Sequence, residues 1–130
     1  MGRDHSNTSI LVVDDEQDIV NLIKQSLEIN GFQVHTFTDA LSALEYFNLN
    51  PKAHHVVISD IRMPGMNGYE FVKQVKKLNP KVKIILMSAF EIKDKEFHNV
   101  LPDIKVDTFL QKPFSIAQLK EVTKKISTRA

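Results

Sequence analysis

Short strand-like runs alternate with helical stretches five times along the chain. The runs lie at residues 10–13, 32–37, 56–60, 82–87 and 106–110, and the first, third and fourth consist mostly of Val, Ile and Leu. Such continuous apolar runs are typical of strands that are buried on both faces, as in a parallel sheet. Strands that alternate with helices through short connections form a parallel sheet covered by right-handed crossovers. The pattern therefore predicts an α/β domain with a five-stranded sheet and helices on both faces.

Capping and turn residues indicate where the helices begin and end. Asp39 is placed as an N-cap, and the pairs Asn67 with Glu70 and Ser115 with Gln118 have the spacing of capping boxes. The expected helix ends share turn-forming residues, namely Gly31, the pair Asn50-Pro51 and the pair Asn79-Pro80.

Apolar residues at helical spacing define the helix faces that are expected to be buried. In four helices these residues are Ile19, Leu22, Ile23, Leu27, Ala40, Ala43, Leu44, Phe47, Phe71, Val72, Val75, Leu78, Ile116, Leu119, Val122 and Ile126. A further helix is expected near residues 91–100, where Pro102 cuts it short.

Length and composition favour a single soluble domain. The 130 residues fit a polar leader at 1–8, a folded domain at 9–126 and a tail at 127–130. The formal net charge of +1 gives no electrostatic footprint for nucleic acid. No apolar run approaches the roughly 20 residues needed to cross a bilayer, and the absence of cysteine suits a reducing cytosol. We therefore expect a cytoplasmic domain without direct contact to nucleic acid or membrane.

Carboxylates follow the first and third strands at their carboxyl ends. Asp14 and Asp15 come directly after the first strand, and Asp60 ends the third, before the turn at residues 63–65. In the doubly wound strand order 2-1-3-4-5 the first and third strands are neighbours, so the three carboxylates would share one crevice. Carboxylates packed together repel one another unless a cation neutralises them. Oxygen ligands without Cys or a nearby His favour a hard ion, Mg²⁺ before Ca²⁺ or Zn²⁺.

Two further side chains are expected at the same edge of the sheet. Ser88 follows the fourth strand and offers a hydroxyl, and Lys112 follows the fifth and offers an ammonium that can bind a phosphoryl oxygen. Two acids for a metal, one carboxylate free to attack, a hydroxyl and a cation are the parts of a site that transfers a phosphoryl group onto a carboxylate. The pattern therefore predicts phosphoryl transfer to Asp60.

The same motifs resemble the receiver domain of two-component response regulators. The resemblance covers residues 9–126 and rests on Asp14-Asp15-Glu16, Asp60-Ile61-Arg62-Met63-Pro64-Gly65-Met66-Asn67-Gly68, Ser88-Ala89 and Lys112-Pro113-Phe114. It implies a flavodoxin-like fold and a phosphoacceptor switch, which catalyses only its own phosphorylation and dephosphorylation and is not otherwise an enzyme.

By this resemblance, Asp60 accepts a phosphoryl group from a histidine kinase or a phosphotransfer protein. Asp15 and Asp60 would bind Mg²⁺ directly, together with the backbone carbonyl of Arg62, and Asp14 would act mostly through metal-bound water. Mg²⁺ is the only cofactor implied.

The resemblance also implies how the switch works. Ser88 would move toward the phosphoryl group, Phe109 would rotate inward behind it, and Lys112 would hold a phosphoryl oxygen. The Lys112–Pro113 peptide would be cis, a rare state that X-Pro bonds reach at low cost. Phosphorylation would reshape the face formed by the fourth helix, fifth strand and fifth helix, which would then bind an unknown effector protein or a second copy of the chain.

Several positions bear on how such a switch is tuned. Ser88 replaces the more frequent Thr and keeps the hydroxyl, whereas Phe109 replaces the more frequent Tyr and has none. Phe90, two residues after Ser88, occupies a position that in this family tunes hydrolysis of the aspartyl phosphate. Its size predicts a longer phosphoryl lifetime than a small residue would give.

Two other functions and a histidine metal site fit the sequence less well. A Mg²⁺-dependent phosphohydrolase with an aspartyl-phosphate intermediate would need an acid two residues after the nucleophile, where this chain has Arg62. A flavin-binding module of the same topology would need a phosphate loop after the first strand, where the acids at 14–16 would repel phosphate. His54 and His55 point to opposite faces of a strand, so we do not expect them to share a metal.

Overall fold

The computed structural model describes residues 7–89 and 105–128 of the chain. Its elements are β1 (Ser9–Val13), α1 (Gln17–Ile29), β2 (Gln33–Phe37), α2 (Ala40–Leu49), a 3-10 turn (Pro51–Ala53), β3 (Val56–Asp60), α3 (Gly68–Leu78), β4 (Lys83–Ser88), β5 (Thr108–Gln111) and α5 (Ile116–Ser127). The helix expected near residues 91–100, together with Phe90 and Pro102, lies outside the described residues.

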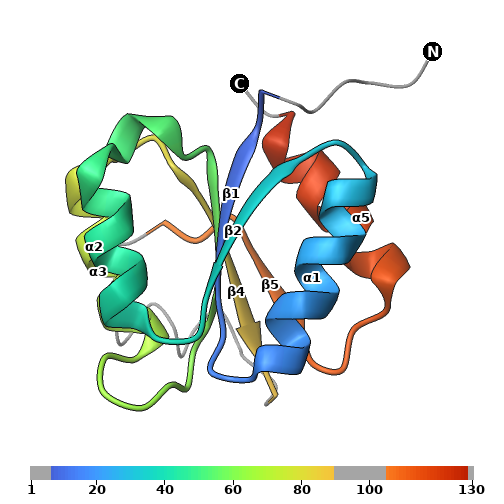
Figure 1. Cartoon of the computed structure of the whole chain (residues 1–130), viewed down its shortest axis with the longest axis horizontal. Coiled ribbons are helices and arrows are strands. Elements are labelled where there is room, and N and C mark those ends of the chain that lie inside the picture. Colours follow the sequence, from blue (N-terminus) through green and yellow to red (C-terminus); the bar gives the residue numbers. More distant parts are fainter. Residues whose placement is uncertain (1–6, 90–104, 129–130) are drawn as a thin grey trace.

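The five strands form one parallel sheet in the order β2-β1-β3-β4-β5, which confirms the predicted order. Helices α2 and α3 pack together on one face of the sheet, and α1 and α5 pack together on the other (Figure 1). All strands run in one direction, so their carboxyl ends share one edge and their amino ends share the opposite edge. None of the helices among the described residues is long and apolar enough to cross a membrane.

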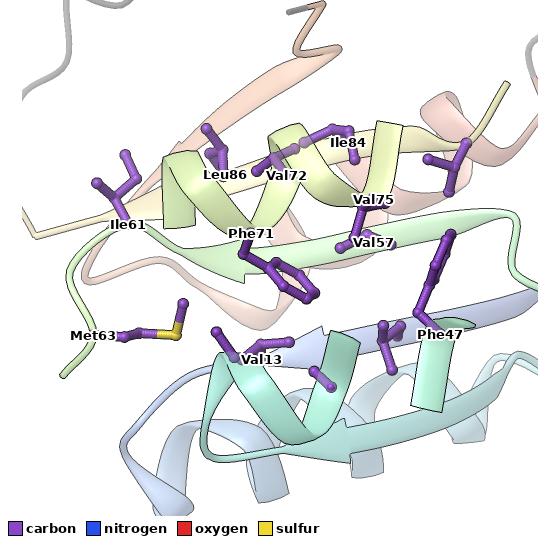
Figure 2. Close-up of a cluster of buried hydrophobic side chains, with 14 residues drawn as sticks. Val13, Phe47, Val57, Ile61, Met63, Phe71, Val72, Val75, Ile84 and Leu86 are labelled. Carbon is purple, nitrogen blue, oxygen red and sulfur yellow. The ribbon is translucent and has the colours of Figure 1, made fainter. Parts of the chain in front are cut away.

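The core consists of two apolar layers, one on each face of the sheet. Alternate residues of β1 divide between them: Leu11 and Val13 face α2 and α3, whereas Ile10 and Val12 face α1 and α5. Figure 2 shows the first layer, in which Phe71 of α3 and Phe47 of α2 pack over the sheet. Burial of each such side chain stabilises the fold by about 1.5–3 kcal/mol. Burial on both faces explains why the strands consist of continuous runs of apolar residues.

The predicted helix signals are confirmed at several positions. The side chain of Asp39 accepts a hydrogen bond from the Ser42 amide, and Ser115 forms a reciprocal capping box with Gln118. Gly31 follows the C-cap of α1 with φ 93°, a left-handed conformation that favours glycine.

Three residues predicted to be buried are exposed. Leu22 and Leu78 are each 38% exposed, and Ile116 is 44% exposed. In α1 the buried stripe is centred on Val20, Ile23 and Leu27, so Leu22 lies at its edge. Ile116 is the first residue of α5, where the helix has not yet turned its apolar face to the sheet. Strand β5 begins at residue 108 instead of 106, and the 3-10 turn at 51–53 was not predicted.

Candidate functional site

Three carboxylates meet at the carboxyl edge of the sheet. Asp14 and Asp15 follow β1, Asp60 ends β3, and these two strands are neighbours in register, with Val13 opposite Ser59. One oxygen from each carboxylate lies within 4.8 Å of the others. Asp14 is completely buried, Asp60 is 7% exposed and Asp15 is exposed. The structure therefore brings together the three acids that the sequence predicted.

The position of Asp60 is fixed by the loop that follows it. The Ile61 amide donates to Asp60 Oδ1 at 3.0 Å and to the Met87 carbonyl of β4 at 3.0 Å. The loop then folds back, so that the Gly68 amide donates to the Ile61 carbonyl at 2.7 Å. A Cβ at Gly68 would lie 2.2 Å from the Asp60 carbonyl oxygen, closer than any real contact. Only glycine allows α3 to begin directly against the end of β3.

Lys112 reaches into the acidic cluster from the loop after β5. Its Nζ donates to Asp14 Oδ2 at 2.5 Å and lies 3.6 Å from Asp60 Oδ2 and 4.0 Å from a carboxylate oxygen of Glu16. Its backbone amide donates to the Ser88 carbonyl at 2.7 Å. The Lys112–Pro113 peptide is cis, as predicted. In this structure the ammonium partly neutralises the buried pair Asp14 and Asp60.

The electrostatics of the cluster disfavour a charged Asp60. Burial, followed by the charge of Asp14, raises the pKa of Asp60 to about 6, although Lys112 and the Ile61 amide act in the opposite direction. Burial alone would lower the pKa of Lys112, but its hydrogen bond and attraction to Asp14, together with Asp60 and Glu16, raise it. Lys112 thus stays charged. Ionisation of Asp60 costs free energy unless a bound cation adds positive charge to the cluster.

A family model for the response regulator receiver domain matches residues 10–124. The chain belongs to the response regulator receiver domain family. Receiver domains are phosphoacceptor signalling modules, and membership implies a cognate histidine kinase.

Curated relatives of the chain are response regulators. It is 33% identical over 125 residues to the alkaline phosphatase synthesis transcriptional regulatory protein PhoP of Bacillus subtilis, covering 95% of this chain and 50% of that protein. It is 34% identical over 113 residues to the response regulator SaeR of Staphylococcus aureus, covering 86% of this chain and 47% of that protein. The chain therefore spans about half the length of these relatives.

Solved structures show the same fold. A response regulator receiver domain protein from Clostridium thermocellum superimposes with a TM-score of 0.82 at 29% identity, covering 94% of this chain and 95% of that one. The response regulator TrrA of Thermotoga maritima, in complex with Mg²⁺-BeF, superimposes with a TM-score of 0.76 at 34% identity, covering 92% and 98%.

The donor set of this receiver domain fits a magnesium ion. The three carboxylates offer only oxygen atoms, and their convergence within 4.8 Å matches the preference of Mg²⁺ for a few carboxylates with water in the remaining positions. Asp15 is exposed and therefore accessible from solvent. The acidic triad is thus consistent with Mg²⁺ binding.

The other predicted site residues lie around this cluster. Ser88 is the buried last residue of β4, one position beyond Met87, which pairs with Asp60 in the register. Phe109 of β5 is half-buried beside the core layer under α2 and α3. Arg62 is exposed in the loop after β3, where it lines a cavity of about 500 Å³ with Met63 and Tyr69.

Glu16 and Gly68 have roles in the site that were not predicted from the sequence. Glu16 lies near Lys112, and its amide donates to Asp14 Oδ1 at 2.9 Å, which orients that carboxylate. Gly68 permits the close packing under Asp60. Both belong to the motifs that carried the family resemblance, and the signal for Gly68 was a glycine at a helix start, where a better helix former would be expected.

Proposed function

We propose that Asp60 is the residue that takes the phosphoryl group from the histidine kinase. The single observation that supports this most strongly is that Asp60 ends a central strand, within 4.8 Å of two further carboxylates and 3.6 Å from the Lys112 ammonium. In the transfer, an Asp60 carboxylate oxygen forms a bond to phosphorus as the bond from phosphorus to the histidine nitrogen breaks. The electron pair of that bond stays on the imidazole, which takes up a proton.

The proposed Mg²⁺ ligands are Asp14, Asp15, Asp60 and the backbone carbonyl of Arg62. Asp14 would act mostly through metal-bound water. When bound, the ion neutralises the carboxylates and the phosphoryl oxygens. The residues of the chain supply the rest. The Ile61 amide donates a hydrogen bond to one carboxylate oxygen of Asp60. The Lys112 ammonium, which contacts Asp14 in this structure, is close enough to contact a phosphoryl oxygen instead.

Ser88 and Phe109 are the proposed switch residues. The Ser88 hydroxyl would donate a hydrogen bond to the phosphoryl group. Phe109 would move further into the apolar layer between the sheet and helices α2 and α3. The Lys112 amide is bonded to the Ser88 carbonyl, so movement at the end of β4 is coupled to the loop that leads into α5. This is a population shift between two packings of the face that includes β5 and α5. The predicted fourth helix of that face lies outside the described residues.

The partners beyond the kinase are also proposals. We propose that, once Asp60 is phosphorylated, the face formed by β5 and α5 contacts an effector protein. It could instead contact a second copy of the chain in a phosphorylation-dependent homodimer. A phosphotransfer protein could replace the kinase as the immediate donor. A cytoplasmic location is proposed because the chain has no cysteine and a phosphohistidine donor is made with cytoplasmic ATP.

Intact-mass measurement tests this assignment. With Mg²⁺ and acetyl phosphate, the wild-type chain is expected to gain one phosphate of about 80 Da, and Asp60→Asn is expected to gain none. The exposed carboxylate of Asp18 in the first turn of α1 provides a matched control, and Asp18→Asn should be labelled like wild type. Phosphate on Asp60→Asn, or incorporation into wild type when Mg²⁺ is chelated before acetyl phosphate is added, would contradict the proposed acceptor or its metal.

A further inference from the structure

Another cavity lies at the amino edge of the sheet, opposite the acidic cluster. It has a volume of about 910 Å³ and is bounded by the residues that precede or begin β3, β4 and β5, by the C-terminal end of α3 and by Ser127 at the end of α5. This is the edge where β1 begins and α5 ends, at the top of Figure 1. Five of its lining residues are lysines: Lys52, Lys76, Lys81, Lys83 and Lys105.

The positive charge of this cavity is hardly offset by its own lining. Asp107 is the only acidic residue among the described residues that line it, and its Oδ2 already accepts a hydrogen bond from the Ile84 amide at 2.8 Å. Lys76 is committed to the structure, because its Nζ donates to the Val82 carbonyl at 2.6 Å and the Pro80 carbonyl at 3.2 Å. Burial lowers the pKa of Lys76, and the charges of Lys105 and Lys83 lower it further, although Asp107 opposes them.

The other four lysines keep their charge available. Among the described residues, ion pairs are formed by Lys24 and Lys112, and Lys52, Lys81, Lys83 and Lys105 form none. Ammonium groups that surround a concavity repel one another, and a bound anion removes that repulsion.

The cavity also has an apolar wall. Val56, Leu78, Pro80 and Val82 line it beside the lysines, and Leu78 is 38% exposed. Its volume lies within the range of about 300–1,000 Å³ that is usual for small-molecule sites, in which apolar walls are combined with a few polar groups. An apolar wall beside several cations suits a molecule with a flat, weakly polar body and a multiply charged end.

We propose that this cavity binds a small phosphorylated molecule of the nucleotide class. Its phosphates would contact Lys81, Lys83 and Lys105, and its base would lie against Leu78 and Pro80. This site is separate from the phosphoacceptor: it uses none of the acidic residues, and its ligand would bind without a metal ion.

Titration of the isotopically labelled full chain by NMR tests the proposal. The probes are ADP, pyrophosphate and adenosine, each added in EDTA, so that no metal recruits phosphate to the acidic cluster. ADP is expected to produce saturable shifts at the amides of Lys81, Lys83 and Lys105, with a dissociation constant of about 1 mM or lower. Pyrophosphate binding as tightly as ADP would overturn the nucleotide assignment, because the base would then add nothing to the affinity.

Two double variants separate this site from general attraction between charges. Lys81→Gln/Lys83→Gln removes two charges from the cavity and is expected to weaken ADP binding by about tenfold or more. Lys73→Gln/Lys124→Gln removes two exposed charges that do not line the cavity and is expected to bind like wild type. Equal losses in the two variants, adenosine binding as tightly as ADP, or shifts that do not saturate would each overturn the proposal. Asp60→Asn should retain binding, so failure of the phosphoacceptor assignment would leave this result unchanged.

Discussion

Replacing Asp60 by Asn should stabilise the metal-free domain at neutral pH. Burial and the neighbouring Asp14 raise the pKa of Asp60 from 3.8 to about 6, so the folded protein holds this proton more tightly than the unfolded chain does. The resulting stabilisation is fully present below about pH 4 and is lost as the pH rises toward 6. Wild type then carries a destabilising ionised group that Asn does not have.

The magnitude follows from the difference in pKa. A rise of about 2 units corresponds to about 3 kcal/mol, at about 1.4 kcal/mol for each unit. The Asn amide has nearly the shape of the carboxyl group and keeps an oxygen for the Ile61 amide, which donates at 3.0 Å in wild type. We therefore expect Asp60→Asn to exceed wild type in free energy of unfolding by about 2–3 kcal/mol above about pH 7.

Urea unfolding across this pH range, in EDTA, is the appropriate assay. The difference between Asp60→Asn and wild type should be small near pH 4, grow as the pH rises toward 6 and then stay constant. Glu45→Gln changes an exposed carboxylate on α2 and serves as the matched control. Saturating Mg²⁺ should stabilise wild type by mass action and reduce or reverse the difference, because Asn is a poorer ligand.

A difference that is the same at every pH would refute this reasoning. It would mean that Asn stabilises the fold through packing or through the unfolded state instead of through the charge of Asp60. A wild type that is more stable than Asp60→Asn in EDTA at neutral pH would also refute it, because Lys112 would then more than offset the burial of the carboxylate and the charge of Asp14.

Four further changes test other parts of the structure. Gly68→Ala should cost about 1–3 kcal/mol of unfolding free energy and slow phosphate incorporation, because a Cβ would meet the Asp60 carbonyl at 2.2 Å; urea unfolding and intact mass measure the two effects. Lys112→Met should raise the pKa of Asp60 further, as a carboxyl-carbon NMR titration would show, because Lys112 lowers that pKa in wild type. Burial, followed by the charges of His35 and His55, lowers the pKa of His54 below 6.5, so the unfolded chain takes up a proton first and stability is lost as the pH falls from 6.5 through this lowered pKa; His54→Phe in the Asp60→Asn background should flatten the urea midpoints in that range. Ser115→Ala should cost about 1 kcal/mol in the same assay, because the α5 capping box is lost.

The strands and helices could be predicted because their signals are local, whereas the strand order 2-1-3-4-5 was inferred from the doubly wound class and is not displayed by the sequence itself. Strands such as Val56–Asp60 are buried on both faces and therefore read as uninterrupted apolar runs. Cap residues such as Asp39 and Ser115 act on amides only three positions away, so sequence spacing reveals them. Once the strands were ordered, the convergence of Asp14 and Asp60 followed from the parallel direction of β1 and β3.

Contacts between distant segments could not be predicted in the same way. Lys112 was expected to hold a phosphoryl oxygen, but in this structure its ammonium donates to Asp14, 98 positions away in the chain. His54 is buried among Phe47, Tyr46 and His35, with its ring 5.1 Å from that of Phe47. No periodicity marks these contacts, because each depends on how two elements approach each other. The predicted burial of Leu22 was wrong for a related reason. Helical spacing shows which residues share a face of the helix but not which of them lie at the centre of the buried stripe.

The net charge of +1 conceals a strong separation of charge across the sheet. In a parallel sheet, residues that follow strands gather at one edge and residues that precede or begin strands gather at the other. Asp14, Asp15 and Asp60 stand at strand ends, whereas Lys83 and Lys105 stand at or before strand starts, so topology turns a balanced composition into an acidic edge and a basic edge. An anionic phosphodonor is repelled by the acidic edge until a divalent cation binds there. Metal-dependent phosphorylation at Asp60 and metal-free anion binding at the amino edge, as proposed above, would therefore be two consequences of the same sheet.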